Sequence, residues 1–129
     1  MQFKQIKETC LYVKDLNATE EFYAGKLGLE CFAKTPDRHA FFRLGTSVLL
    51  CFNPEITKNE TRFPAHFAEG KQHIAFEVSQ IEYDKRKEEI QSAGITITHE
   101  HDWPNGFKSF YFDDPDGHVL EIVPEGMWD

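Results

Sequence analysis

Residues 109–123 read SFYFDDPDGHVLEIV, and this stretch places two apolar segments on either side of a turn. Ser109–Phe112 and His118–Val123 are rich in aromatic and β-branched residues, which favour strands, while the DPDG sequence between them is typical of a turn. The stretch therefore predicts two strands joined by a turn. The second strand carries one acidic residue, Glu121, within an otherwise apolar run.

The segments that precede this stretch complete one module. His73–Val78 has the composition of a strand, and Ser79 with Glu82 forms a capping-box pattern that predicts the start of a helix. Gly94 ends that helix, and Ile95–Thr98 is expected to form the next strand. The order is strand, helix, strand, strand, strand.

The first half of the chain repeats this order. Glu8 precedes the helix-ending Gly28 by 20 residues, and His73 precedes Gly94 by 21 residues. The predicted first-half elements are a strand at Thr9–Val13, a helix starting near Asn17, and strands at Leu29–Ala33, Ala40–Leu44 and Val48–Phe52. The repeat predicts a single α+β domain over residues 1–129, built from two βαβββ modules at about 5–53 and 73–124 with a linker at 54–72.

Strand alternation indicates which side chains point away from the helices. Glu8, Cys10 and Tyr12 share one face of the first strand, whereas the residues between them are apolar or threonine. In the strand at His73–Val78, His73 opposes a fully apolar face. Because the apolar face is the one expected to meet the helix, we expect Glu8 and His73 to face a cavity enclosed by the two modules.

The position that matches Glu121 in the first half depends on how the repeat is aligned. Glu121 stands four residues after Gly117, and Leu49 stands four residues after the turn glycine Gly45. Counting back from the prolines that follow both strands matches Glu121 with Cys51 instead. The first alignment places Glu121 beside Glu8 and His73.

Composition limits the classes of function. The chain has 22 acidic and 14 basic residues and a net charge of -8, which argues against a nucleic-acid-binding surface. No apolar run reaches the length of a membrane span and the N-terminal MQFKQIKE lacks a signal sequence, so we expect a cytoplasmic protein without membrane contacts. Three widely spaced cysteines suit reduced core thiols.

Three segments resemble the vicinal oxygen chelate superfamily, which includes glyoxalases, fosfomycin-resistance enzymes, extradiol dioxygenases and bleomycin-resistance proteins. They are LYVKDLNATEEFYAGKLGL (11–29), HIAFEV (73–78) and SFYFDDPDGHVLEIV (109–123). The resemblance implies paired βαβββ modules, a cup-shaped site and, in many members, a divalent metal. Carried over by position, the ligands fall on Glu8, His73 and Glu121, while Leu49 stands where glyoxalases have a fourth, acidic ligand.

One imidazole and two carboxylates suit Zn, Mn, Fe, Ni or Co. Two negative ligands weaken the Lewis acidity of the ion and differ from the two-His, one-carboxylate set of iron oxygenases, so lyase or isomerase chemistry is favoured over dioxygenation. Glu8 is then the candidate general base, and Tyr111 is a candidate hydrogen-bond donor to substrate. The predicted pocket lining is Cys10, Tyr12, Leu49, Ser109 and Tyr111.

Several other residues have a functional and a structural interpretation. Arg43 suits an anionic substrate or an exposed salt bridge, and the tryptophans suit a lid or a dimer contact. Three histidines, His66, His99 and His101, are interpreted as surface residues. The residues concerned are Arg43, His66, His99, His101, Trp103 and Trp128.

The leading hypothesis is a homodimeric, metal-dependent lyase or isomerase whose small-molecule substrate chelates the ion through adjacent oxygens. The alternative is a metal-free protein of the bleomycin-resistance type that sequesters a bulky ligand, such as a cationic one, in an acidic, aromatic-lined groove; the net charge of -8 is compatible with it. A third is an interaction module that retains only the fold. The sequence does not identify the substrate.

Overall fold

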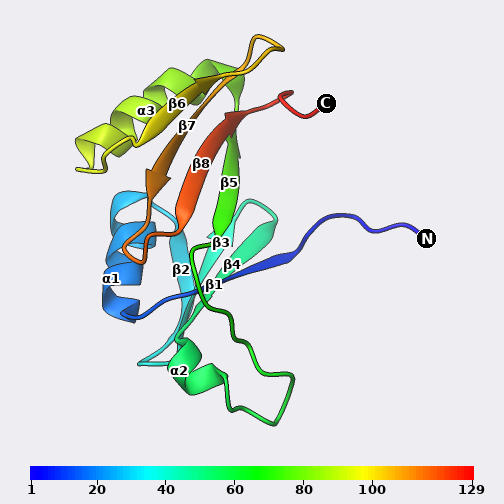
Figure 1. Cartoon of the computed structure of the whole chain (residues 1–129), viewed down its shortest axis with the longest axis vertical. Helices are drawn as coiled ribbons and strands as arrows, with labels where there is room; N and C mark the ends of the chain where they lie inside the picture. Colours follow the sequence, from blue (N-terminus) through cyan, green and yellow to red (C-terminus); the bar gives the residue numbers. More distant parts are fainter. The chain divides into compact units, whose positions relative to one another are not determined.

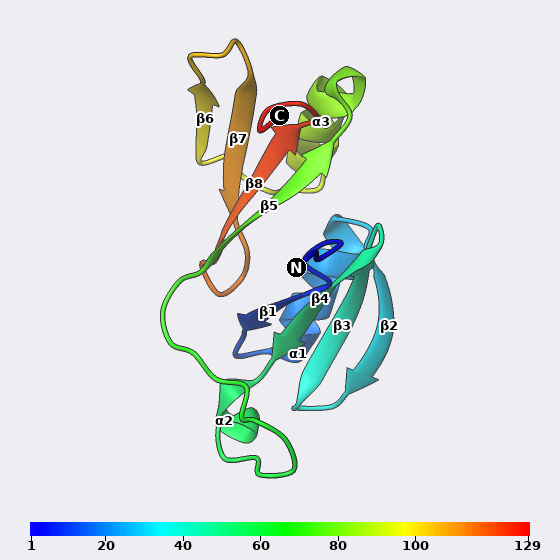
Figure 2. The ribbon, with the colours of Figure 1, turned by 90° about the vertical axis from the view of Figure 1, so that its right-hand side faces the viewer.

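Two four-stranded mixed sheets carry the fold, one in each half of the chain (Figures 1 and 2). The computed structural model describes residues 1–129 and divides into two compact units, Met1–Gly70 and Lys71–Asp129. The strand order is β1-β4-β3-β2 in the first unit and β5-β8-β7-β6 in the second. The two orders are the same pattern, so the predicted α+β repeat is present in both units.

The first unit begins with a strand and a short helical segment. Asp15 is the N-cap, and its carboxylate accepts hydrogen bonds from the backbone N–H groups of Asn17 and Ala18 at 2.9 and 3.1 Å. The cap therefore lies two residues before the predicted Asn17. The elements are β1 (Glu8–Tyr12), α1 (Leu16–Glu20), the π-helical η1 (Glu21–Lys26), β2 (Glu30–Thr35), β3 (His39–Leu44), β4 (Ser47–Phe52) and α2 (Pro54–Thr57).

The core of the first unit lies between α1–η1 and one face of the sheet. Tyr23 and Phe42 are both buried, with ring centroids 5.5 Å apart, and Leu11 is buried as well. This arrangement leaves Glu8 and the side chains in phase with it on the opposite face of β1. The segment expected to be a plain linker contains α2, and the Arg38 guanidinium donates to both carboxylate oxygens of Glu60 at 2.7 and 2.8 Å.

The second unit has the same order of elements. They are β5 (His73–Val78), the single-turn η2 (Gln80–Glu82), α3 (Tyr83–Ser92), β6 (His99–Asp102), β7 (Lys108–Asp113) and β8 (Val119–Pro124). The Ser79 hydroxyl donates to the Glu82 carboxylate at 2.8 Å, but this pair starts η2 and α3 begins only at Tyr83. Tyr83 packs on the buried Phe110 with ring centroids 5.4 Å apart, and Figure 2 shows α3 on one side of this sheet.

The strand predicted at Ile95–Thr98 is displaced along the chain. The structure places β6 at His99–Asp102, paired antiparallel with β7. Ile95 is only 7% exposed, and its N–H donates to the carbonyl of Ile90 in the last turns of α3, so this apolar stretch closes the helix end before the strand begins. The strand was predicted at Ile95–Thr98 because this segment is rich in β-branched residues. Burial of Ile95 against the end of α3 instead keeps the segment out of the sheet.

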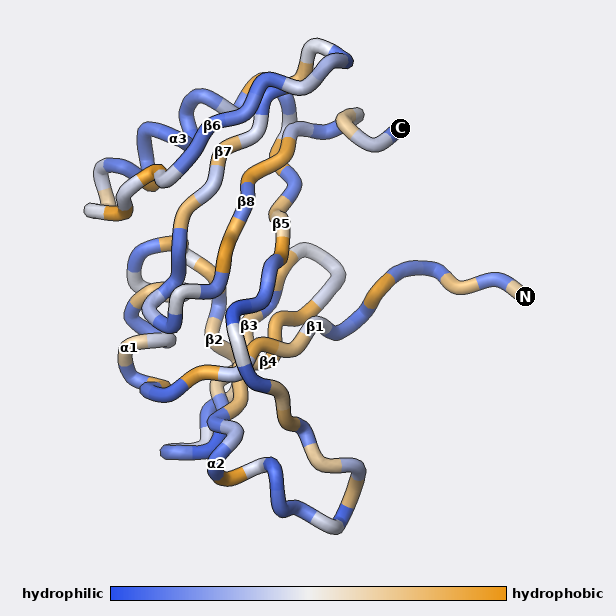
Figure 3. Tube along the Cα trace, in the orientation of Figure 1, coloured by the Kyte–Doolittle hydropathy of each residue, from blue (hydrophilic) through white to orange (hydrophobic).

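Hydropathy along the trace differs between strands (Figure 3). The inner strands β4 and β8 are mainly hydrophobic, whereas the edge strand β6 is hydrophilic throughout. No helix is both long and apolar enough to span a bilayer.

Candidate functional site

His73 and Glu121 lie on neighbouring parallel strands of the second unit. His73 opens β5 and pairs with Val119, and Ala75 pairs with Glu121, so both side chains are on the same face of the sheet. The His73 Nε2 and Glu121 Oε2 atoms are 3.2 Å apart. The structure therefore brings together two of the three residues predicted to bind metal.

The backbone fixes the protonation pattern of His73. Its Nδ1 lies 2.8 Å from the Val119 carbonyl oxygen, which can only accept, so Nδ1 carries the proton in this contact. A neutral ring then presents the Nε2 lone pair toward Glu121. Two electron-rich atoms at this distance require a proton or a cation near them. A backbone carbonyl that holds the imidazole in this way is a common feature of metal-binding histidines.

The Glu121 carboxylate is buried, and only one of its two oxygens has a hydrogen-bond partner. Its side chain is 7% exposed, and Oε1 has no hydrogen-bond partner. Burial, followed by a hydrogen bond with Glu121, raises the pKa of Tyr111, while a hydrogen bond with Ser109 lowers it. An orphaned carboxylate oxygen beside an imidazole lone pair fits a divalent cation, which prefers such donors. No group of three or more potential ligands converges in the structure.

Glu8 lies in the other unit, at the exposed start of β1. Cys10 and Tyr12 follow it on the same face. Burial raises the pKa of the Cys10 thiol, and the charge of Glu8 raises it further, so Cys10 is poorly suited to act as a thiolate nucleophile. Burial also raises the pKa of Tyr12, with a smaller contribution from Cys10.

Leu49 does not belong to this face. Cys10 pairs with Leu50 just as Ala75 pairs with Glu121, so Leu50 is the repeat counterpart of Glu121. Leu49 instead pairs with Phe42 and is buried on the helix side of the sheet. The predictions that matched Glu121 with Leu49 or with Cys51, and that placed Leu49 in the pocket, were therefore wrong.

Turn length explains this shift. Leu44 pairs with Ser47, which leaves two residues in the β3–β4 turn, whereas Asp113 pairs with Val119 across a five-residue connection. The two turn glycines, Gly45 and Gly117, therefore occupy different places in their turns. Counting from them does not give the same strand register.

Aromatic side chains cover the face of the first sheet that carries Tyr12. Phe52 packs on Phe41 with ring centroids 5.3 Å apart and on His66 at 4.8 Å, and His39 stacks on Phe41 at 4.1 Å. His66, interpreted as a surface residue, thus contacts an aromatic cluster.

Arg43 has the structural role that was the simpler of its two interpretations. It lies 3.3 Å from Glu30 in an exposed ion pair, and its guanidinium is 4.3 Å from the centroid of the Phe32 ring. No contact in this arrangement points to an anionic substrate.

His99 and His101 are exposed, as the sequence predicts, and they lie on the same face of the second sheet as His73 and Glu121, which the sequence did not predict. His99 pairs with Tyr111, which in turn pairs with Glu121, so the side chains of all three point to the same side. The Nε2 of His99 and Nδ1 of His101 are 3.5 Å apart. The alternation in His-Glu-His-Asp would have indicated this face if the strand had been placed four residues later.

Trp103 closes one end of this face. Its indole N–H donates to Ser109 Oγ at 2.9 Å, and its ring lies 4.6 Å from that of His101 and 5.9 Å from that of Trp128. Ser109 is fully buried by this arrangement, so it positions Trp103 and Tyr111 and is not open to substrate. Trp128 is 75% exposed.

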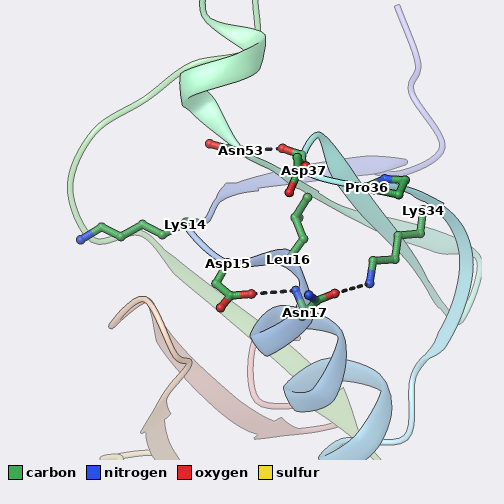
Figure 4. Close-up of a pocket in the computed structure, with 8 residues that line it drawn as sticks. All are labelled: Lys14, Asp15, Leu16, Asn17, Lys34, Pro36, Asp37 and Asn53. Atoms are coloured by element: carbon green, nitrogen blue, oxygen red, sulfur yellow. Dashed lines mark hydrogen bonds between the residues drawn. The ribbon is translucent and has the colours of Figure 1, made fainter.

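A separate cavity of about 410 Å³ lies at the start of α1 in the first unit (Figure 4). Its polar walls include charges of both signs, and Lys34 Nζ donates to Asn17 Oδ1 at 2.8 Å. None of the predicted site residues lines it. The lining residues are Lys14, Asp15, Leu16, Asn17, Lys34, Pro36, Asp37 and Asn53.

The repeated sheets and the His–Glu pair define a protein class, and comparison with known families identifies it. Residues 5–122 match the Glyoxalase/Bleomycin resistance protein/Dioxygenase superfamily, and the chain belongs to this family. The resemblance inferred from the three sequence segments is confirmed.

Three members of this family are similar to the chain over most of its length. A lactoylglutathione lyase from Agrobacterium tumefaciens has a similar structure, with a TM-score of 0.93, 35% identity and 98% coverage of both chains. A Nocardioides glyoxalase/bleomycin resistance protein/dioxygenase gives a TM-score of 0.76 at 28% identity, covering 98% of this chain and 87% of that one. The metallothiol transferase FosB of Lysinibacillus sphaericus (strain C3-41) is 28% identical over 124 residues, which is 95% of this chain and 83% of FosB.

Proposed function

We propose that the protein is a metal-dependent enzyme whose small-molecule substrate chelates a divalent ion through two adjacent oxygens. His73 and Glu121 hold the ion, and Glu8 is the third ligand or the general base. The observation that carries this proposal is the buried, unpartnered Oε1 of Glu121 next to an imidazole whose Nδ1 is fixed by the backbone. Such a pair is costly without a cation and well suited to one.

A divalent ion bound there would act as a Lewis acid toward negative charge that develops on a substrate oxygen. One imidazole and two carboxylates match Zn, Mn, Fe, Ni or Co. The protein side chains supply the rest of the chemistry. Glu8 is exposed and carries a carboxylate that can accept a substrate proton, and the raised pKa of Tyr111 keeps its hydroxyl protonated as a hydrogen-bond donor.

We favour lyase or isomerase chemistry as the reaction of this proposed enzyme. The solved relative with 35% identity is a lactoylglutathione lyase, and its similarity extends over 98% of the chain. FosB, at 28% identity, is a metallothiol transferase, and its name indicates a metal and a transfer reaction that involves a thiol. Thiol transfer is therefore the competing reaction for the same metal centre.

A metal-free binding protein is the second candidate function. The aromatic cluster of Tyr12, Phe41 and Phe52 favours it, because aromatic rings on the sheet face away from the helix suit a flat or cationic ligand; Phe52 is buried, so the half-buried Tyr12 and Phe41 are the rings that such a ligand would reach. This candidate leaves the His73–Glu121 pair without a role. We therefore rank it below the enzyme.

Metal analysis of untagged protein purified without chelator tests the proposal. We expect about one ion per chain, and His73→Ala should abolish tight binding because loss of one of few ligands costs orders of magnitude in affinity. His66→Ala is the matched control, since it removes an imidazole that lies in the first unit against Phe52. Equal metal content in wild type and His73→Ala would reject the assignment.

The role of Glu8 needs a separate variant. Glu8→Gln lowers metal content if Glu8 is a ligand, whereas it keeps the metal and lowers turnover if Glu8 is the base. Glu77→Gln is the control, because Glu77 is an exposed acid on the His73 face of β5. A Glu8→Gln variant that behaves like Glu77→Gln would make Glu8 a surface acid only.

A further inference from the structure

A strip of polar side chains continues from the His73–Glu121 pair across the second sheet. The ring of Tyr111 lies 6.1 Å from that of His73 on one side and 5.8 Å from that of His99 on the other. His101 follows His99 on the same face of β6. The proposed metal centre and the two histidines of the edge strand are thus parts of one continuous surface.

The two histidines form a preorganised pair. Their facing nitrogens, His99 Nε2 and His101 Nδ1, are 3.5 Å apart, so two neutral rings that share this hydrogen bond keep one outer N–H that can donate to a ligand. The Trp103 ring packs on His101 at 4.6 Å, and Trp103 is itself held by its hydrogen bond to Ser109. Both histidines are exposed, so a small molecule can reach them.

Acidic groups near the pair are directed away from it. Glu100 and Asp102 alternate with the histidines and therefore point to the opposite face of β6, where Glu100 pairs with Lys87 and Asp102 lies 3.7 Å from Lys108. The acids on the face that carries His73 and Glu121 are at other positions, on β5, β7 and β8. The His99–His101 end is therefore the part of this face that suits a negatively charged group.

We propose that His99 and His101 bind an acidic group of the substrate, so that the enzyme selects molecules with a carboxylate or phosphonate opposite their chelating oxygens. The proposal rests on the metal centre proposed above and names the substrate class for it. Two strand spacings separate Glu121 from His99, which is about 10 Å between backbones. The acidic group therefore belongs at the far end of a small substrate and does not compete for the ion.

A matched pair of catechols tests this selectivity. Dihydrocaffeate and para-propylcatechol chelate metals through the same two hydroxyls and have side chains of similar length, but only the first carries a carboxylate. Calorimetric titration of Mn(II)-loaded protein without oxygen should show about tenfold tighter binding of dihydrocaffeate, as expected for one hydrogen bond to a charged group. The double variant His99→Ala/His101→Ala should bind both catechols equally while keeping its manganese.

The control is Glu100→Ala/Asp102→Ala, which changes the opposite face of the same strand and should retain the preference. Equal binding of the two catechols by wild type, or an undiminished preference in the histidine variant, would overturn the inference while leaving the metal centre in place. Protein that takes up no manganese would instead refute the metal centre, and the inference with it, whereas loaded protein that binds neither catechol would overturn the inference alone. The two proposals therefore fail in distinguishable ways.

Discussion

Replacing Glu121 with leucine should stabilise the metal-free protein while destroying its function. The buried Glu121 Oε1 has no partner, and such a group costs about 1–3 kcal/mol. A leucine side chain buried in the same place contributes about 1.5–3 kcal/mol. The repeat shows that the site accepts this residue, because Leu50 is buried at the equivalent position of the first sheet.

The hydrogen bond of the Glu121 carboxylate with Tyr111 offsets part of this gain. Glu121→Leu removes it at a cost of about 1.5–3 kcal/mol, as for a hydrogen bond to a charged group, whereas no ion pair is lost with the neutral His73 ring, whose Nε2 lone pair faces the carboxylate. His73 is 51% exposed, so water can satisfy its Nε2. The net expectation is an increase of about 1–2 kcal/mol in the free energy of unfolding, within the range for replacing buried polar pairs by apolar residues.

Guanidinium unfolding followed by tryptophan fluorescence measures this change. In EDTA the variant should unfold at a higher denaturant concentration than wild type, with Glu77→Leu as an exposed control that changes by about 0.5 kcal/mol or less. With metal at about 100 times its Kd, wild type should gain about 2.7 kcal/mol and the variant nothing. A variant less stable than wild type in EDTA would show that the Glu121 carboxylate is fully satisfied in the apo protein, and would refute the reasoning.

Two further predictions concern single side chains, and a third concerns assembly. Burial, followed by the charges of nearby acids, raises the pKa of Tyr83 from 10.0 to about 12, so the tyrosine loses its proton at lower pH in the unfolded chain and the free energy of unfolding should fall as pH rises from 10 to 12. Tyr83→Phe should remove this part of the fall in alkaline unfolding curves, and an unchanged pH profile would exclude Tyr83 as its source. Leu49→Ala should cost about 2–5 kcal/mol in denaturant unfolding, because Leu49 is buried in the helix-side core; a cost below about 1 kcal/mol would place it on the open face. If two chains share each metal centre, mixing Glu8→Ala with His73→Ala protein should restore metal binding in hybrid dimers, whereas dimers without rescue would favour sites built within one chain.

The sequence predicts the repeat and the faces of the outer strands because these depend on local patterns. His73 and Glu8 were assigned correctly to their faces, since apolar residues alternate with them and must cover a helix. The same alternation could not decide the face of Glu121, which apolar residues surround on both sides. Only the pairing of Ala75 with Glu121 settles it.

The remaining errors arise where long-range packing overrides composition. Leu49 was misplaced because register depends on how many residues each turn contains, and a glycine does not reveal its position within the turn. The position of His99 and His101 in β6 was not predicted because the β-branched run at Ile95–Thr98 has the stronger strand propensity but closes the end of α3. In both cases a displacement of a few residues changes which side chains lie on the sheet face away from the helix.

The polarity of β6 has a further consequence for the behaviour of the protein in solution. This strand forms an edge of its sheet, and all four of its residues are exposed. An edge with free backbone groups invites strands from other molecules, and charged or titratable side chains on both of its faces discourage such pairing. Each residue of His-Glu-His-Asp thus helps to keep the molecules from aggregating through this edge. A lineage that exchanged both histidines for β-branched apolar residues, for instance to accept an uncharged substrate, would acquire an aggregation-prone strand at the same time.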